Sequence, residues 1–222
     1  MTISTTNAEG PVRKSLWPNL LTVARMGLGA VVAALVLIAA ALVYTDHVLA
    51  GLVYAVALVA FLIAAATDWL DGYLARRLNA VTPLGAALDH CADKVLITCA
   101  LVALAYGALP INLAAAAIII LGRDVAVAGL REGLANAGRG LPVGSVGKWK
   151  AAAEMAGVGA FLAYLASAQL SDAESLSNGL EWAATMLLWA AAALALISAF
   201  QYVGAALKPA GSVRTAELGD VQ

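Results

Sequence analysis

The sequence predicts an all-α polytopic membrane protein with six transmembrane helices and both termini in the cytoplasm. Hydrophobic residues make up 63% of the chain and charged residues only 12%, whereas about a quarter of the residues in a soluble domain are charged. Uncharged runs of about 20 residues recur along the chain, and each is long enough to cross a hydrocarbon core of ~30 Å. Lys and Arg are concentrated in alternate links between these runs.

The six helices follow in order from the apolar runs and from the turn signals that separate them. We expect them near Leu20–Tyr44, Val48–Leu78, Leu84–Tyr106, Asn112–Asn136, Lys148–Gln169 and Glu181–Leu207. The first apolar run is longer than the hydrophobic region of a signal peptide, so we interpret it as a retained span. These helices form one predicted membrane domain over residues 16–207, between cytoplasmic tails at residues 1–15 and 208–222.

The distribution of basic residues predicts the orientation of the helices. The links at residues 45–47, 107–110 and 171–178 contain no Lys or Arg. The other links and the tails carry or adjoin Arg13, Lys14, Arg76, Arg77, Arg139, Lys148, Lys150, Lys208 and Arg214. The positive-inside rule therefore predicts that both termini lie in the cytoplasm. We also expect a multi-pass protein of the inner (cytoplasmic) membrane whose active site faces the cytoplasm. The net charge of -1 gives no reason to expect nucleic acid as a partner.

Ionisable residues gather in the cytoplasmic parts of the second, third and fourth expected helices. They are Asp68, Asp71, Asp89, Asp93, Lys94, Arg123, Asp124, Arg131 and Glu132. Charges are costly beside lipid, so these side chains are expected to face one another or water in a polar chamber. A purely structural network of ion pairs is the alternative, but the four aspartates have few cationic neighbours to neutralise them.

The four aspartates form two helical pairs. Asp68 and Asp71 are three residues apart and Asp89 and Asp93 are four apart, so each pair projects from one face of its helix. Clustered carboxylates repel unless a cation lies between them, and their hard oxygens favour Mg²⁺, Mn²⁺ or Ca²⁺. A site with two such ions is suited to phosphoryl or phosphodiester transfer.

The run from Asp68 to Arg76, followed by Gly85, Asp89 and Asp93, resembles the CDP-alcohol phosphatidyltransferase family, whose signature it matches at every fixed position. The resemblance implies six transmembrane helices, a homodimer, and two divalent cations, Mg²⁺ or Mn²⁺. It also implies attack of an alcohol on the β-phosphorus of CDP-diacylglycerol, with release of CMP. The implied metal ligands are Asp68, Asp71, Asp89 and Asp93, and Asp93 is also the base that takes the acceptor's proton.

The same resemblance implies a site for the nucleotide lipid. Gly72, Arg76 and Thr82 hold the cytidine diphosphate in the family pattern. By its residue type, Gly85 either leaves backbone open where a bulky ligand could approach or only allows two helices to pack closely. The segment from Trp17 to Arg25 is similar to the family's amino-terminal segment, in which Asn19 and Thr22 would approach this lipid. By composition alone, the segment is an interfacial anchor with Trp17 at headgroup depth.

The basic residues of the fourth and fifth expected helices predict a phosphorylated acceptor. Arg123 and Arg131 lie eight apart on one helix, and Lys148 and Lys150 begin the next. These segments resemble the phosphatidylglycerophosphate synthase branch of the family, which implies sn-glycerol 3-phosphate as the acceptor. The chain departs from that branch at three positions. The branch usually has Glu in place of Asp124, often Ser or Thr in place of Ala128, and Thr in place of Ala151. Topology alone could also explain basic residues on this side of the membrane.

Other functions remain open from the sequence. Within the family, the acceptor could be another alcohol, such as inositol phosphate or serine. An ion-coupled membrane transporter also carries intramembrane carboxylates, but transport sites commonly lie near the bilayer midplane and between paired repeats. The charges here lie toward one surface, and we find no internal repeat. A membrane scaffold has no need for four converging aspartates.

Overall fold

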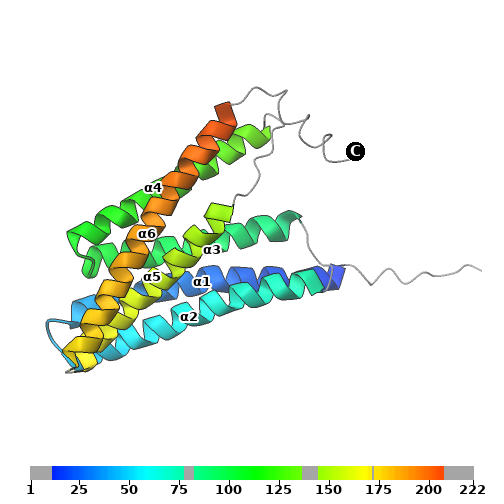
Figure 1. The fold of residues 1–222 in the computed structure, drawn as a ribbon. Helices are drawn as coiled ribbons and strands as arrows, with labels where there is room; N and C mark the ends of the chain where they lie inside the picture. The colour runs from blue at the N-terminus through cyan, green and yellow to red at the C-terminus, as the bar shows by residue number, and fades with distance from the viewer. Residues whose placement is uncertain (1–11, 78–82, 137–144, 172, 208–222) are drawn as a thin grey trace, which may run out of the picture. The chain divides into compact units, whose positions relative to one another are not determined.

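The computed structural model describes residues 12–77, 83–136, 145–171 and 173–207, and α-helices joined by short turns are the only regular secondary structure in these residues (Figure 1). Side chains are described for residues 22–67, 91–136, 146–171 and 173–207. The helices are α1 (Val12–Leu42), α2 (His47–Arg77), α3 (Pro83–Gly107), α4 (Ile111–Asn136), α5 (Ser145–Leu170) and α6 (Glu174–Leu207). The prediction of an all-α protein is thus confirmed for the described residues.

The helix boundaries agree with the predictions except at two amino-terminal ends. Helix α1 begins at Val12 rather than Leu20, and α6 begins at Glu174 rather than Glu181. Residues 171–178 were predicted to be a link, but the last five of them lie in α6. The Ser171 hydroxyl accepts a hydrogen bond of 3.1 Å from the Ala173 amide just before the helix, and Glu174 in the first turn complements the helix dipole.

The short turn between α1 and α2 shows why the chain reverses where it does. Asp46 caps α2, because its Oδ1 accepts a hydrogen bond of 2.9 Å from the Leu49 amide. The amides of Thr45 and Asp46 both bond to the Leu42 carbonyl, at 3.0 and 2.9 Å, and close the end of α1. A polar three-residue sequence between two apolar runs is therefore sufficient for the reversal.

Five helical stretches are long and apolar enough to cross a membrane. They are Thr22–Leu42, His47–Thr67, Ile111–Asn136, Val146–Leu170 and Glu174–Leu207. The chain is accordingly a multi-pass membrane protein by length and composition. The sixth span, predicted within α3, and the cytoplasmic position of both termini stay predictions, as do the domain limits at residues 16 and 207.

The described residues form two compact units. The first contains the described residues up to Leu109 together with Val158–Ala184. In it, α1 packs against both α2 and α3, and α1 and α2 run side by side in Figure 1. The buried face of α1 repeats every three or four residues through Thr22, Arg25, Gly29, Val32, Val36 and Ala39. This spacing is that of one helix face.

Helices α1 and α3 approach each other closely at Gly29. A Cβ atom added at this position would lie 3.1 Å from the Cα atom of Leu96, which is tighter than ordinary van der Waals contact. Gly29 follows Arg25 by one turn on α1, and Leu96 follows Asp93 by about one turn on α3. The missing side chain therefore allows the two backbones to meet next to a pair of charged residues.

The second unit contains Pro110–Gly157 together with the described residues from Thr185 onward. It includes α4, the first half of α5 and the last two-thirds of α6. Its buried apolar residues are Leu113, Ala116, Ala117, Ile120, Val127, Leu188, Ala191, Ala192, Ala195 and Tyr202. A Cβ at Gly157 would meet the Leu188 side chain at 3.0 Å, so α5 and α6 also pack closely.

Candidate active site

The predicted aspartate pairs lie on two helices of the first unit. Helix α2 continues without interruption through positions 68 and 71, and α3 through positions 89 and 93. Spacings of three and four residues therefore correspond to single helix turns at both pairs. Among these aspartates, only Asp93 has a described side chain. The predicted nucleotide-lipid residues Asn19, Gly72, Arg76 and Gly85 are also helical without a described side chain, and Thr82 lies outside the described residues.

Asp93 is bound by Arg25, a residue that the sequence analysis did not assign to the site. The Arg25 Nη1 atom donates to Asp93 Oδ1 at 2.9 Å. The Arg25 side chain is fully buried, whereas the Asp93 side chain is 37% exposed. A guanidinium without solvent is stable only beside such acceptors, so this ion pair links α1 to α3. The available signal was an arginine at the start of an otherwise apolar run.

Thr22 lies on the same face of α1 as Arg25, one turn earlier. Its side chain is buried, with 3% of the residue exposed. The residue therefore belongs to the packed face that α1 presents within the first unit rather than to the helix face that is exposed in the structure. Contact between Thr22 and the nucleotide lipid stays a prediction.

The donor set is suited to hard divalent cations. Carboxylate oxygens from two pairs, one helix turn apart within each pair, are the ligands that Mg²⁺ and Mn²⁺ prefer. Within the side chains that the structure describes, no three His, Cys, Asp or Glu residues form a group that could hold a metal ion. Three of the four predicted ligands lie outside that set, so the metal site stays a prediction.

The second unit contains a buried ionic cluster around Lys150. The Lys150 Nζ atom lies 2.7 Å from Asp124 Oδ1 and 2.5 Å from Glu154 Oε1. The three side chains are only 5%, 13% and 5% exposed, respectively. The sequence analysis predicted that Lys150 binds the acceptor, and this role stays a prediction; in the structure Lys150 pairs with two carboxylates. Its immediate role in this structure is to neutralise them.

Arg123 joins this cluster from α4. Its Nη1 atom donates to the same Asp124 Oδ1 at 2.9 Å, and its Nε atom donates to the Ser198 hydroxyl at 3.0 Å. Ser198 is buried and donates in turn to the Ala195 carbonyl at 2.9 Å. The guanidinium is therefore held in one orientation by groups from two helices. Asp124, at which the chain departs from its predicted family branch, is shared by Arg123 and Lys150.

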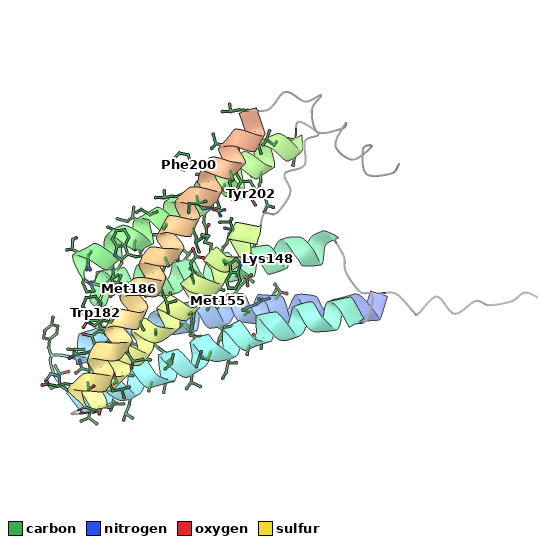
Figure 2. The ribbon with its side chains drawn as sticks, viewed as in Figure 1. Lys148, Met155, Trp182, Met186, Phe200 and Tyr202 are labelled. Carbon is green, nitrogen blue, oxygen red and sulfur yellow. The ribbon has the colours of Figure 1, made fainter. Side chains whose placement is uncertain are left out.

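Two arginines meet the ring of Tyr202 on α6. The guanidinium carbons of Arg123 and Arg131 each lie 5.5 Å from the ring centroid, within the range of a cation–π contact. Figure 2 labels Tyr202 near the end of α6 and Lys148 near the start of α5. Lys148 is exposed, and the described residues give it no ion-pair partner.

All four predicted acceptor residues lie in the second unit, where Arg123 and Lys150 share the carboxylate of Asp124, and Arg123 and Arg131 share the ring of Tyr202. Two carboxylates, Asp124 and Glu154, accompany them, so the cations are in excess. An excess of buried or half-buried positive charge favours an anionic ligand. The sequence analysis missed Glu154, Ser198 and Tyr202. The signal for the last two was a pair of polar residues one turn apart on an apolar helix.

The sequence model described as CDP-alcohol phosphatidyltransferase matches residues 15–197. This range contains all six helices except the first three residues of α1 and the carboxyl-terminal end of α6. It also contains the four aspartates and the basic cluster of Arg123, Arg131, Lys148 and Lys150. Ser198 and Tyr202, which contact the arginines of this cluster, lie beyond the matched range.

Several curated proteins are similar to this chain. A Pseudomonas fluorescens CDP-diacylglycerol–glycerol-3-phosphate 3-phosphatidyltransferase is 51% identical over 43% of this chain and half of its own length. A Haemophilus influenzae protein of the same name is 38% identical over 64% of this chain and 72% of its own length. A rice protein named cardiolipin synthase (CMP-forming) is 34% identical over 64% of this chain and 46% of its own length.

Proposed function

Because the chain belongs to the CDP-alcohol phosphatidyltransferase family, we propose that it transfers a phosphatidyl group from CDP-diacylglycerol to sn-glycerol 3-phosphate. The products are phosphatidylglycerophosphate and CMP, and the process is phospholipid biosynthesis. The oxygen of the acceptor hydroxyl forms a bond to the β-phosphorus. The bond from this phosphorus to the bridging oxygen breaks, and its electron pair leaves with CMP.

Asp93 is the proposed base for this step. Its carboxylate is partly exposed and therefore accessible to a substrate hydroxyl, and Arg25 holds it on α3. Taking the hydroxyl proton while the new phosphorus–oxygen bond forms makes the acceptor a stronger nucleophile. A carboxylate fixed by a buried ion pair loses little further freedom when the substrate is bound.

Asp68, Asp71, Asp89 and Asp93 are the proposed ligands of two divalent cations, Mg²⁺ or Mn²⁺. Cations bound there would neutralise the diphosphate and lower the pKa of the acceptor hydroxyl. The helical spacing of each pair and the hard oxygen donors support this proposal. For the nucleotide lipid we propose Asn19, Thr22, Gly72, Arg76, Thr82 and Gly85, on the basis of the family signature.

The basic cluster of the second unit is the observation from which we infer that the acceptor alcohol carries a phosphate. Arg123, Arg131, Lys148 and Lys150 are its proposed phosphate-binding residues. Lys150 contributes mainly by neutralising Asp124 and Glu154, which allows Arg123 to remain a net donor of positive charge. A free alcohol without a phosphate would not require two arginines against one aromatic ring.

We further propose that α3 is the sixth span, that both termini and the active site face the cytoplasm, and that the protein acts as a homodimer in the inner membrane. The alternation of basic and non-basic links supports the orientation. The homodimer is supported by the resemblance to the family.

The decisive experiment measures CMP release by the purified protein. The assay contains CDP-diacylglycerol, Mg²⁺ or Mn²⁺, and in turn sn-glycerol 3-phosphate, inositol phosphate, serine or phosphatidylglycerol. The last acceptor is included because one relative is named a cardiolipin synthase. We expect turnover with sn-glycerol 3-phosphate. Turnover with another alcohol alone would reject the acceptor, and no CMP release with any alcohol would favour a transporter.

The acceptor site is tested by Arg123→Gln and Arg131→Gln. Each change removes charge-assisted hydrogen bonds worth ~1.5–3 kcal/mol, so the KM for sn-glycerol 3-phosphate should rise at least about ten-fold. The KM for CDP-diacylglycerol should change little. Glu132→Gln is the matched control, because Glu132 is an exposed charge on the same helix without an ion pair in the described residues. Equal changes in both KM values would indicate a structural role.

A further inference from the structure

Two arginines converge on one aromatic ring in the second unit. Positions 123 and 131 are separated by ~12 Å along the axis of α4. Their guanidinium carbons nevertheless both lie 5.5 Å from the centroid of Tyr202 and therefore within twice that distance of each other. Tyr202 is 9% exposed, so its ring is a fixed surface rather than a mobile side chain.

Pairing with carboxylates does not explain why both arginines contact this ring. Arg123 shares the carboxylate of Asp124 with Lys150, whereas Arg131 has no carboxylate partner among the described residues. Glu132, its neighbour in sequence, is exposed and forms no ion pair with it there. Two like charges that contact one ring repel each other, and an anion bound between them would offset this repulsion. The electron-rich face of the ring reduces this repulsion but leaves the net charge unchanged.

We propose that Tyr202 is a positioning residue for the acceptor, because its ring holds Arg123 and Arg131 together so that both bind the acceptor's phosphate. This inference rests on the proposed function and extends it to a residue on α6. Arginine has many rotamers, and a ring that selects one of them reduces the entropy lost when phosphate binds. Ser198, one turn earlier on α6, fixes Arg123 from the side of its Nε atom.

The inference predicts that the ring matters and the phenol hydroxyl does not. Tyr202→Leu removes both cation–π contacts, so the KM for sn-glycerol 3-phosphate should rise about ten-fold. Tyr202→Phe keeps the ring and should restore most of the acceptor affinity. The KM for CDP-diacylglycerol should stay within about two-fold of the wild-type value in both variants, since the arginines are not part of the proposed lipid site.

Phe200→Leu is the matched control. Phe200 is 76% exposed, and Figure 2 shows it on the opposite side of α6 from Tyr202. Its replacement removes an aromatic ring from the same helix and should leave both KM values unchanged. If Tyr202→Leu does not yield folded protein, Tyr202→Met, which has a flexible side chain of considerable bulk, replaces it in the assay.

Three results would overturn the inference. The first is an unchanged acceptor KM in Tyr202→Leu, and the second is a parallel rise of both KM values. The third is loss of folded protein in both the Leu and Met variants while Tyr202→Phe folds, which would make the ring structural. Failure of the proposed function is a separate result, because wild-type protein would then release no CMP with sn-glycerol 3-phosphate.

Discussion

Lys150→Met tests whether Lys150 stabilises the protein or binds substrate. The change removes the cation that lies 2.7 Å from Asp124 and 2.5 Å from Glu154. Breaking a buried ion pair costs about 3–5 kcal/mol. Two carboxylates lose a partner here, and no side chain in the group is more than 13% exposed, so we expect about 4–5 kcal/mol. At about 2–4 °C per kcal/mol, Tm should fall by roughly 10–20 °C.

The assay is thermal unfolding of the detergent-solubilised protein. Lys148→Met is the control, because Lys148 is exposed on the same helix and its loss should change Tm little. The double variant Lys150→Met/Glu154→Leu removes a buried carboxylate together with the cation. It should recover about 2 kcal/mol relative to the sum of the single changes. A Tm for Lys150→Met within about 2 °C of wild type, with a raised acceptor KM, would refute the structural role.

Three other predictions concern the first unit. Asp93→Asn keeps the size of the side chain but removes the base, so kcat should fall ~10²-fold or more while CDP-diacylglycerol still binds; near-normal turnover would exclude Asp93 as the base. A chelator should abolish CMP release and added Mg²⁺ or Mn²⁺ should restore it, whereas full activity in excess chelator would contradict the metal proposal. Gly29→Val should destabilise the protein by about 1–3 kcal/mol, since a Cβ there lies 3.1 Å from the Leu96 Cα atom. Gly27→Val is its control, with no heavy atom within 4 Å of the added Cβ, and equal Tm values for the two variants would disprove the close approach.

The helices were predictable because their signals are local. Each apolar run predicts a span by its own length, and the short polar links between α1 and α2 and between α3 and α4 were predicted within a few residues. The exception at α6 is also local. Ser171 and Glu174 are residues of loops and of helix starts alike, and polarity alone does not distinguish the two.

The sequence by itself was enough to predict which residues carry the chemistry. Asp68, Asp71, Asp89 and Asp93 are identified by spacing within two helices, and helical periodicity depends only on neighbours along the chain. The same is true of Arg123 and Arg131, which are recognised as charges in an apolar helix.

Only the tertiary structure decided how these charges are paired. Arg25 meets Asp93 across 68 residues of sequence, Lys150 meets Asp124 across 26, and Arg123 meets Ser198 across 75. Which residues form ion pairs between helices depends on which helices are neighbours and on how each helix is rotated about its axis. No local sequence pattern encodes the neighbours or the rotation. Packing therefore assigned Lys150 to two carboxylates and placed Tyr202 against both arginines, because a buried charge is stable only beside groups that compensate it.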